Sequence, residues 1–230
     1  MRVYTPDKVE PAVLSIQGML RKIDHLYLPH TSRRDLESIL VRQVSKELDL
    51  LLPWQAGHGQ QTAVIALWIG EAAHLDAVTL HQLKLAALLH DVGLLMLPLH
   101  LQSERGSLDP ESYVAIQNHP RLGATLLEPF SFLRDATIMI AHHHERWDGS
   151  GYPYGLRGEF IPVGARILAV ADAFDAIDIP GVDDRGLRDH IALRILRVAS
   201  ATQFDPFVVS LLGELLGKME TTGLNETLHL

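Results

Sequence analysis

The sequence contains no cysteine among its 230 residues. This absence excludes a disulfide scaffold, a thiol nucleophile, an iron–sulfur cluster and any zinc site with thiolate ligands. Basic residues are also few, because 20 Lys and Arg stand against 28 Asp and Glu and give a formal net charge of -8. We therefore expect no nucleic acid polymer as a partner. No apolar run approaches the ~20 residues that span a bilayer, so we expect a cytoplasmic protein with no membrane partner.

Histidine, by contrast, is abundant. The chain has 13 histidines, and His142, His143 and His144 are consecutive. Without thiolates, a transition metal would have to be bound by imidazole and carboxylate groups. That ligand set suits iron, manganese or zinc more than copper(I).

The apolar residues recur at helical spacing, and no stretch alternates for long enough to indicate a β-sheet. These patterns predict an all-α fold. The predicted helices are 32–52, 60–74, 79–92, 109–119, 131–144, 161–178, 186–202 and 205–218. The third is apolar on nearly every side, which is typical of a central helix. The fourth should end near His119, because the residue before Pro120 is biased away from the α conformation.

Composition divides the chain into three parts. We interpret 1–50 as an N-terminal helical or regulatory segment, 51–218 as the main domain and 219–230 as a peripheral tail. Residues 146–164 form the longest irregular segment and are rich in glycine and proline. A long loop of this kind between buried helices is more often functional than accidental.

Polar residues interrupt the apolar helices at several points. His90 and Asp91 end the third predicted helix, and Asp172 stands among apolar residues of a later one. A buried carboxylate needs a partner, and a cation supplies one. Helices that bring imidazoles and carboxylates to one interior point build dinuclear sites, although a hydrogen-bonded polar network is the alternative. His142 should face away, since three successive helical residues cannot all point at one site.

Several segments resemble the HD-GYP phosphodiesterases of the HD superfamily. In chain order they are LAALLHDVG, NHP, HHHERWDGSGYP and ARILAVADAFDA. The resemblance covers roughly residues 55–212. It implies an HD-superfamily helical bundle with a dinuclear metal site in its core, occupied by two divalent ions, iron or manganese.

The resemblance also implies the ligands and the reaction. One ion would be bound by His58, His90, Asp91 and Asp172, and the other by Asp91, His119, His143 and His144. Asp91 would bridge the two ions and is the expected catalytic residue. Members of this family hydrolyse cyclic di-GMP, a bacterial second messenger, to pGpG or GMP. Two adjacent cations bind the phosphodiester and activate a water molecule.

Further residues are expected to support this chemistry. They are Tyr152, Gly151 and Arg185, which would bind substrate, and Glu145, Asp148 and Asp175, which would orient the ligands or hold the loop rather than bind metal.

The sequence departs from the family pattern at three places. Leu94 replaces a lysine that is common three residues after the HD aspartate. Trp54 stands where some members have a glutamate that supports a third metal, so we expect two metals. The segment 177–186 lacks the basic residues that usually contact the nucleotide phosphates, which leaves Arg185 as the candidate.

These departures leave other functions open. One alternative is a catalytically weakened HD-GYP module that binds or docks, with a diguanylate cyclase (GGDEF) domain as its partner. Another is an HD phosphohydrolase that acts on a different nucleotide. A homodimer is a further arrangement that the apolar helices leave open.

Overall fold

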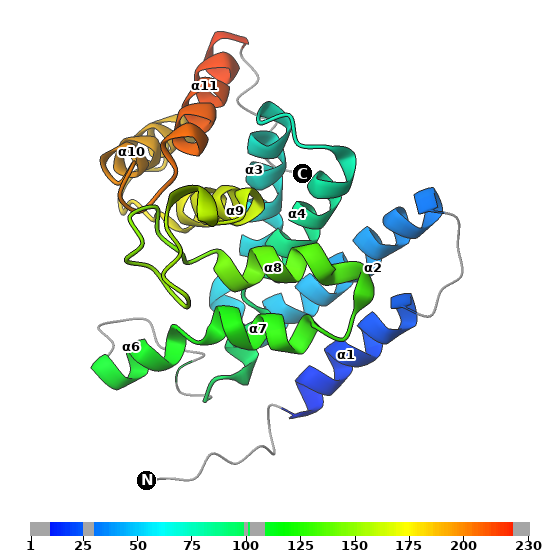
Figure 1. Ribbon diagram of the computed structural model, residues 1–230. Helices are drawn as coiled ribbons and strands as arrows, with labels where there is room; N and C mark the ends of the chain where they lie inside the picture. The colour runs from blue at the N-terminus through cyan, green and yellow to red at the C-terminus, as the bar shows by residue number, and fades with distance from the viewer. Residues whose placement is uncertain (1–9, 25–29, 99–100, 102–108, 223–230) are drawn as a thin grey trace.

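The computed structural model describes residues 10–24, 30–98, 101 and 109–222, and it confirms the all-α class. Within those ranges the chain forms helices and no β-strand (Figure 1). The α-helices are α1 (Glu10–Asp24), α2 (His30–Leu51), α3 (His58–Ala72), α4 (Ala77–Leu89), α6 (Pro110–Ile116), α7 (His119–Leu127), α8 (Arg134–His142), α9 (Val163–Ala176), α10 (Arg185–Val198) and α11 (Pro206–Thr222). The short 3-10 helices are η2 (Pro53–Gln55), η3 (Val92–Met96), η4 (Ser131–Leu133) and η5 (Gly158–Phe160). Among the described helices, none has the length and hydropathy that a membrane span requires.

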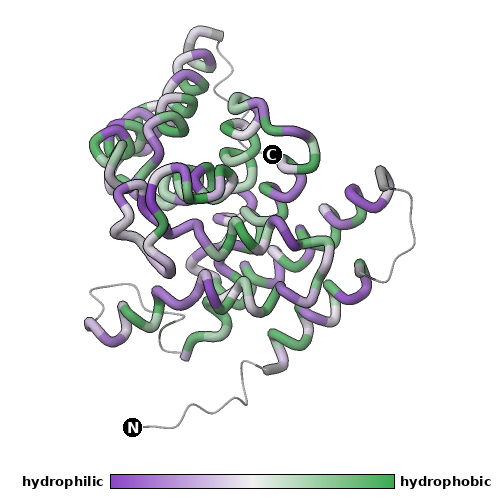
Figure 2. Tube along the Cα trace, in the orientation of Figure 1, coloured by the Kyte–Doolittle hydropathy of each residue, from purple (hydrophilic) through white to green (hydrophobic). Residues whose placement is uncertain are grey.

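Helix α4 lies at the centre of the bundle, as its apolar sequence predicts. It packs against α2, α3, α8 and α9, and its Leu83 and Leu89 are fully buried. The carboxylate of Asp76 caps its first turn by accepting hydrogen bonds from the backbone N–H groups of Val78 (2.8 Å) and Thr79 (2.9 Å). Apolar and polar residues alternate along the surrounding helices (Figure 2), as expected of amphipathic helices. The C-terminal end of α4 is therefore held in the interior.

The predicted helix 109–119 is wrong at its C-terminal end. Helix α6 stops at Ile116, and His119 instead begins α7, a helix that the patterns did not predict. Pro120 lies in the first turn of α7, where its missing N–H has no intrahelical partner to lose. A proline read as the end of one helix thus marks the start of the next.

The N-terminal segment contains a helix that the periodicity did not single out. Helix α1 packs against α2, and its Ile16, Leu20 and Ile23 are buried in the hydrophobic core. This part of the chain is therefore joined to the main bundle by apolar packing.

A glycine brings η3 and α7 into close approach. A Cβ atom at Gly93 would overlap the carbonyl oxygen of His119 and the backbone nitrogen of Gly123. No side chain larger than hydrogen fits there without moving one of the two backbones. Gly93 follows Asp91 by two residues, so this contact sets the start of α7 beside the end of α4.

Candidate metal centre

The structure brings all seven predicted ligands together at the ends and faces of five helices. His58 begins α3, His90 and Asp91 follow the end of α4, His119 begins α7, His143 and His144 follow the end of α8, and Asp172 lies on α9. Segments as far apart in sequence as α3 and α9 pack directly against each other. The cluster can therefore form only in the folded bundle.

The first half of the cluster is formed by His58, His90 and Asp172. Their potential ligand atoms all lie within 4.8 Å of one another. The Oδ1 atom of Asp172 is 3.0 Å from Nε2 of His58 and 3.7 Å from Nε2 of His90. Two imidazoles and a carboxylate are a ligand set that first-row divalent metals accept.

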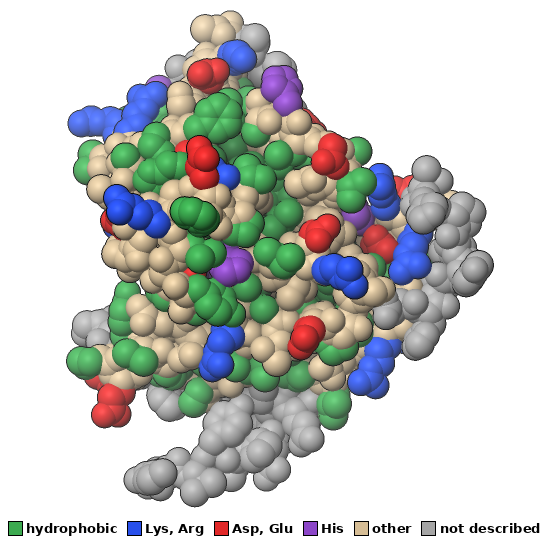
Figure 3. Space-filling model, viewed as in Figure 1, with side chains coloured by type: hydrophobic (Ala, Val, Ile, Leu, Met, Phe, Trp, Pro, Cys, Tyr) green, Lys and Arg blue, Asp and Glu red, His purple; other side chains and the backbone are tan. Residues whose placement is uncertain are grey.

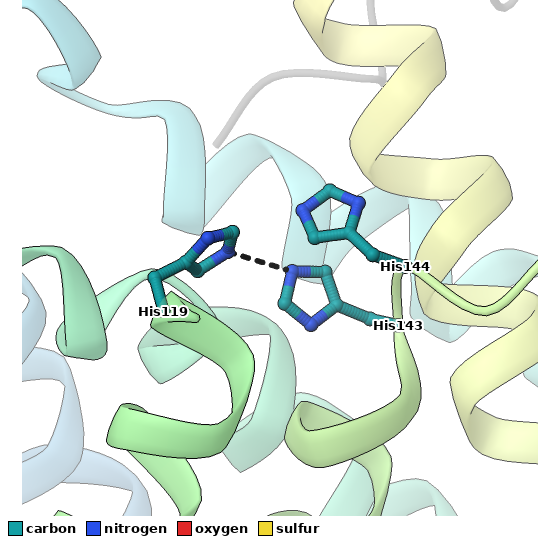
Figure 4. A group of neighbouring side chains, drawn as sticks. All are labelled: His119, His143 and His144. Atoms are coloured by element: carbon teal, nitrogen blue, oxygen red, sulfur yellow. Dashed lines mark hydrogen bonds between the residues drawn. The ribbon is translucent and has the colours of Figure 1, made fainter. Parts of the chain in front are cut away.

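The second half is formed by His119, His143 and His144, whose ligand atoms also lie within 4.8 Å of one another. Figure 4 shows the three rings converging from the start of α7 and the end of α8. The rings of His119 and His144 have centroids 4.9 Å apart, and those of His143 and His144 are 4.1 Å apart.

Asp91 lies between the two halves. Its Oδ2 atom is 3.2 Å from Nε2 of His90, and its Oδ1 atom is 3.2 Å from Nε2 of His119. One carboxylate thus presents one oxygen to each half, which is the placement expected of a bridging ligand.

Backbone carbonyls fix the orientation of three of the rings. The Nδ1–H groups of His90, His119 and His143 donate to the carbonyl oxygens three residues earlier, at 2.9, 2.8 and 2.7 Å respectively. A carbonyl can only accept, so the proton of each neutral ring is on Nδ1 and the lone pair is on Nε2. All three Nε2 atoms face the cluster, as metal-binding histidines require.

Two observations test whether these residues fit a metal. The Nε2 atoms of His119 and His143 lie 3.4 Å apart (Figure 4), so two lone pairs face each other when both rings are neutral. The Nε2 atom of His90 is buried and makes no hydrogen bond within the described residues. A cation in the cluster would satisfy all three nitrogens, and the residues therefore fit a metal.

At Asp91, His143 and His144, burial and neighbouring charges favour the protonation states that metal ligands need. Burial, with the nearby His144 and His119, holds the pKa of His143 well below its usual range. Burial likewise lowers the pKa of His144 to about 4. Burial alone would raise the pKa of Asp91, but the adjacent His90 and His119 hold it well below its usual range. The carboxylate is thus ionised while two of the imidazoles are neutral near pH 7.

His58 is held from behind by Asp175. Its Nδ1 lies 2.7 Å from Oδ2 of Asp175, while its Nε2 faces Asp172. Burial acts against protonation of this ring, but the hydrogen bonds to Asp172 and Asp175 raise its pKa to about 10. A carboxylate behind a metal-binding histidine orients the ring and strengthens it as a ligand, which agrees with the supporting role expected of Asp175.

Gln55 is a site residue that sequence reasoning missed. It ends η2, and its side-chain Nε2 donates a hydrogen bond of 2.5 Å to Oδ2 of Asp91. No motif or spacing marks this glutamine, because its partner lies 36 residues further along the chain. Gln55 holds the carboxylate that lies between the two halves of the cluster.

The glycine-rich loop is held in place by two carboxylates. Glu145 accepts hydrogen bonds from the backbone N–H groups of Tyr154 (2.8 Å) and Leu156 (2.9 Å). Asp148 accepts hydrogen bonds from the backbone N–H (2.9 Å) and the hydroxyl (2.6 Å) of Ser150. Both acidic side chains face the loop, and neither belongs to the metal-type clusters of the described residues.

A cleft of about 320 Å³ opens between this loop, α6 and α9. Its polar lining includes Tyr113, Gln117, His144, Arg146, Tyr152, Asp172 and Gln203. The ring of Tyr152 lies against that of His144, with centroids 5.0 Å apart. The cleft therefore reaches from the outer surface to the cluster.

The remaining expected residues differ in what they contribute. A Cβ atom at Gly151 would overlap backbone atoms of Arg146 and His144, so this glycine is needed for loop packing. Arg185 begins α10, and its side chain lies outside the described part of the chain. Leu94 is buried with the hydrophobic core and does not line the cleft.

Comparison with known proteins agrees with this geometry. The HD domain family matches residues 42–208. A "Probable cyclic di-GMP phosphodiesterase" of Vibrio cholerae serotype O1 is 36% identical over 132 residues, which are 54% of this chain and 30% of the relative. The "Cyclic di-GMP phosphodiesterase response regulator RpfG" of Xanthomonas campestris pv. campestris is 35% identical, over 64% of this chain and 40% of the relative. A "3'3'-cGAMP-specific phosphodiesterase 2" of Vibrio cholerae is 33% identical, over 68% of this chain and 31% of the relative. The chain spans about a third of the length of these curated relatives.

Two solved structures share the fold. The crystal structure of a cyclic GMP-AMP phosphodiesterase of V. cholerae (V-cGAP3) superposes with a TM-score of 0.63 at 22% identity, covering 83% of this chain and 51% of that one. The protein Bd1817 of Bdellovibrio bacteriovorus, described as an HDG"Y"P protein, gives a TM-score of 0.59 at 19% identity, and the match covers 91% of this chain and 71% of that one. At these identities the likeness concerns the fold.

Proposed function

Because the chain belongs to the HD domain family and carries the HD and GYP motifs of the HD-GYP proteins, we propose that it is a metal-dependent phosphodiesterase that hydrolyses cyclic di-GMP to pGpG or GMP. One observation carries this proposal: five histidines and two aspartates, brought together by five helices, form two adjacent groups of potential metal ligands with Asp91 between them. The printed names of its curated relatives, which include cyclic di-GMP phosphodiesterases, support the same reaction.

The ligand assignment follows the two halves of the cluster. His58, His90 and Asp172 would bind one ion, and His119, His143 and His144 the other, with Asp91 as the bridge and the catalytic residue. We propose iron or manganese, because imidazole and carboxylate ligands without thiolates suit these metals. Two such ions, when bound, would polarise the phosphodiester and lower the pKa of a water molecule.

The residues of this chain tune the charge available for that chemistry. An imidazole binds a metal in its neutral form and then brings no charge, while Asp91 and Asp172 together bring two negative charges. The site with two divalent ions would therefore keep a net charge of about +2 facing the substrate. This charge would stabilise the transition state of phosphodiester hydrolysis, which is more negatively charged than the substrate. Asp175 holds Nδ1 of His58 so that its Nε2 faces the cluster.

The cleft beside the loop is the proposed substrate site. Burial raises the pKa of Tyr152, so its phenol stays protonated and can donate a hydrogen bond to a bound nucleotide. Tyr113, on α6, and Gln117, just after α6, also line the cleft, and they offer neutral polar groups to a base or ribose. We include Gly151 for its backbone, and Arg185 at the start of α10 as a contact for phosphate.

Specific observations keep two other functions in view. Some relatives are named as 3'3'-cGAMP-specific phosphodiesterases, so cyclic GMP-AMP is the second candidate substrate. Leu94 and the altered segment 177–186 would suit a module that has kept its fold and metal but lost turnover, and a diguanylate cyclase domain is then its proposed partner. A homodimer, a cytoplasmic location and the division at residues 50 and 218 remain predictions.

The test is a product assay under anaerobic conditions. Wild-type protein loaded with iron or manganese is incubated with cyclic di-GMP and, separately, with cyclic GMP-AMP, beside Asp91→Ala and the control Asp35→Ala, whose side chain is exposed and does not line the cleft. We expect product from the wild type and from Asp35→Ala, and none from Asp91→Ala. No product from a wild type that holds two metal ions per chain would refute the enzyme and favour the docking module. Product from Asp91→Ala would refute this site as its source.

A further inference from the structure

A second cavity lies apart from the metal centre and has a volume of about 340 Å³. It opens where the N-terminal ends of α2, α4 and α8 meet, and the lining residues that matter here are Arg33, Arg34, Glu37, His81, Gln82 and Arg134. We call it the arginine cavity. It shares no lining residue with the cleft beside the loop. Figure 1 shows the starts of α2 and α8 on the same side of the molecule.

The buried carboxylate of the arginine cavity, Glu37, already has partners within the protein. Glu37 is only 5% exposed. It accepts a hydrogen bond from Nε of Arg33 (2.9 Å) and lies 2.8 Å from Nε2 of His81. Burial alone would raise the pKa of Glu37, but its hydrogen bonds to His81 and Arg33 lower it. Glu37 is thus ionised, and its charge serves to hold Arg33 and His81 in the cavity wall.

Two further arginines have no such partner. Among the side chains that the structure describes, none forms an ion pair or a hydrogen bond with the guanidinium group of Arg34 or Arg134. Asp135 is the other carboxylate of the lining, so the two guanidinium groups outweigh it. The cavity therefore has a local excess of positive charge although the chain has a net charge of -8, and such an excess favours an anionic ligand. Basic side chains also gather along the right side of the view in Figure 3.

The wall of the cavity is held rigid by Gln82. Its side chain spans from α4 to the start of α8, donating to the carbonyl oxygen of Phe132 (2.9 Å) and accepting from the N–H of Ala136 (3.0 Å). Both atoms of a buried amide are therefore used to fix one helix start against another helix. The N-terminal ends of helices carry partial positive charge, which adds to that of the arginines.

We propose that the arginine cavity binds a phosphate monoester or free phosphate dianion, with the guanidinium groups of Arg34 and Arg134 as its ligands. One guanidinium group can donate two parallel hydrogen bonds to two oxygens of a phosphate group. Two guanidinium groups balance the two negative charges of a phosphate dianion. The volume lies at the lower end of the range for small-molecule sites, about 300–1,000 Å³. It therefore has room for a phosphate that carries a small organic group as well as for phosphate itself.

The position of the cavity links it to the metal centre. Helix α4 runs from the cavity to His90 and Asp91, and α8 runs from it to His143 and His144. An anion bound there would join α2 to the two helices that lead to four of the seven proposed metal ligands. The binding proposal does not depend on the proposed hydrolase activity.

The test is an NMR titration of the metal-free protein labelled with ¹⁵N. Inorganic phosphate is added in one arm and ribose 5-phosphate in the other, at ionic strength matched with sodium chloride. We expect saturable shifts of the backbone amides in the first turns of α2, α4 and α8. The arm with the lower dissociation constant identifies whether free phosphate or a monoester is preferred.

Variants separate this site from general anion binding. Arg34→Ala combined with Arg134→Ala should weaken binding about 10-fold or more, while the exposed control Arg188→Ala should leave it unchanged. The unshifted amides of the double variant report whether its fold is intact. The proposal is overturned by the absence of saturable shifts at the three helix starts, by equal affinity in the double variant, or by shifts confined to the cleft beside Tyr152.

Discussion

The contact between η3 and α7 supports a quantitative prediction for Gly93→Ala. The added methyl group would overlap the carbonyl oxygen of His119 and the backbone nitrogen of Gly123. Both obstacles are backbone atoms, which cannot rotate away as the end of a side chain can. We therefore expect a cost at the upper end of the range for overpacking, about 3 kcal/mol in the free energy of unfolding. For a chain of this size that corresponds to a loss of about 6–12 °C in Tm.

The same substitution should also disturb the metal centre. The obstructing carbonyl belongs to His119, whose Nε2 lies 3.2 Å from Asp91, so any movement that relieves the overlap shifts a proposed ligand. We expect weaker binding of manganese, measured by competition with a fluorescent chelator, together with the loss in stability measured by urea unfolding. Gly217→Ala is the matched control, because nothing lies within 4 Å of a Cβ atom there, and it should be neutral or stabilising by up to about 1 kcal/mol. Unchanged unfolding of Gly93→Ala would refute the reasoning.

Three other predictions concern the metal centre. Gln55→Ala removes the hydrogen bond to Asp91 and should weaken manganese binding about 10-fold, with unchanged binding by isothermal calorimetry as the contrary result. The pKa of His144 in the folded protein is about 4, which is below its value in the unfolded chain. The metal-free protein should therefore lose stability as the pH falls from about 6.5 toward 4. This residue should lower the free energy of unfolding by about 1.4 kcal/mol per pH unit in that window. His144→Asn should reduce that slope in urea unfolding at pH 6.5, 5.5 and 4.5, and an equal slope would contradict the assignment. Removal of metal by EDTA should lower Tm, because about 4 kcal/mol of stabilisation is expected at a metal concentration 1,000 times Kd; an equal Tm with and without manganese would argue against the site.

Local signals in the sequence were sufficient for the fold class and for the choice of metal-type residues. Apolar spacing predicted an all-α chain with a central helix at 79–92, and α4 occupies that place. Polar residues such as Asp91 and Asp172 stood out because an ionised carboxylate is costly in an apolar helix without a partner. These inferences needed only neighbouring residues, since helical periodicity and the cost of burial are local properties.

Other features depended on how distant segments pack. Pro120 looks the same in sequence whether it ends one helix or begins another. The structure places it in the first turn of α7, a helix that packs against η3. Gln55 carries no motif, and its hydrogen bond to Asp91 arises because η2 and the end of α4 meet in space. The arginine cavity likewise joins residues from α2, α4 and α8. Residue types and their spacing determined which groups were available for chemistry. Helix packing decided which of them meet, because distances between segments far apart in the chain are set by the burial of their apolar faces.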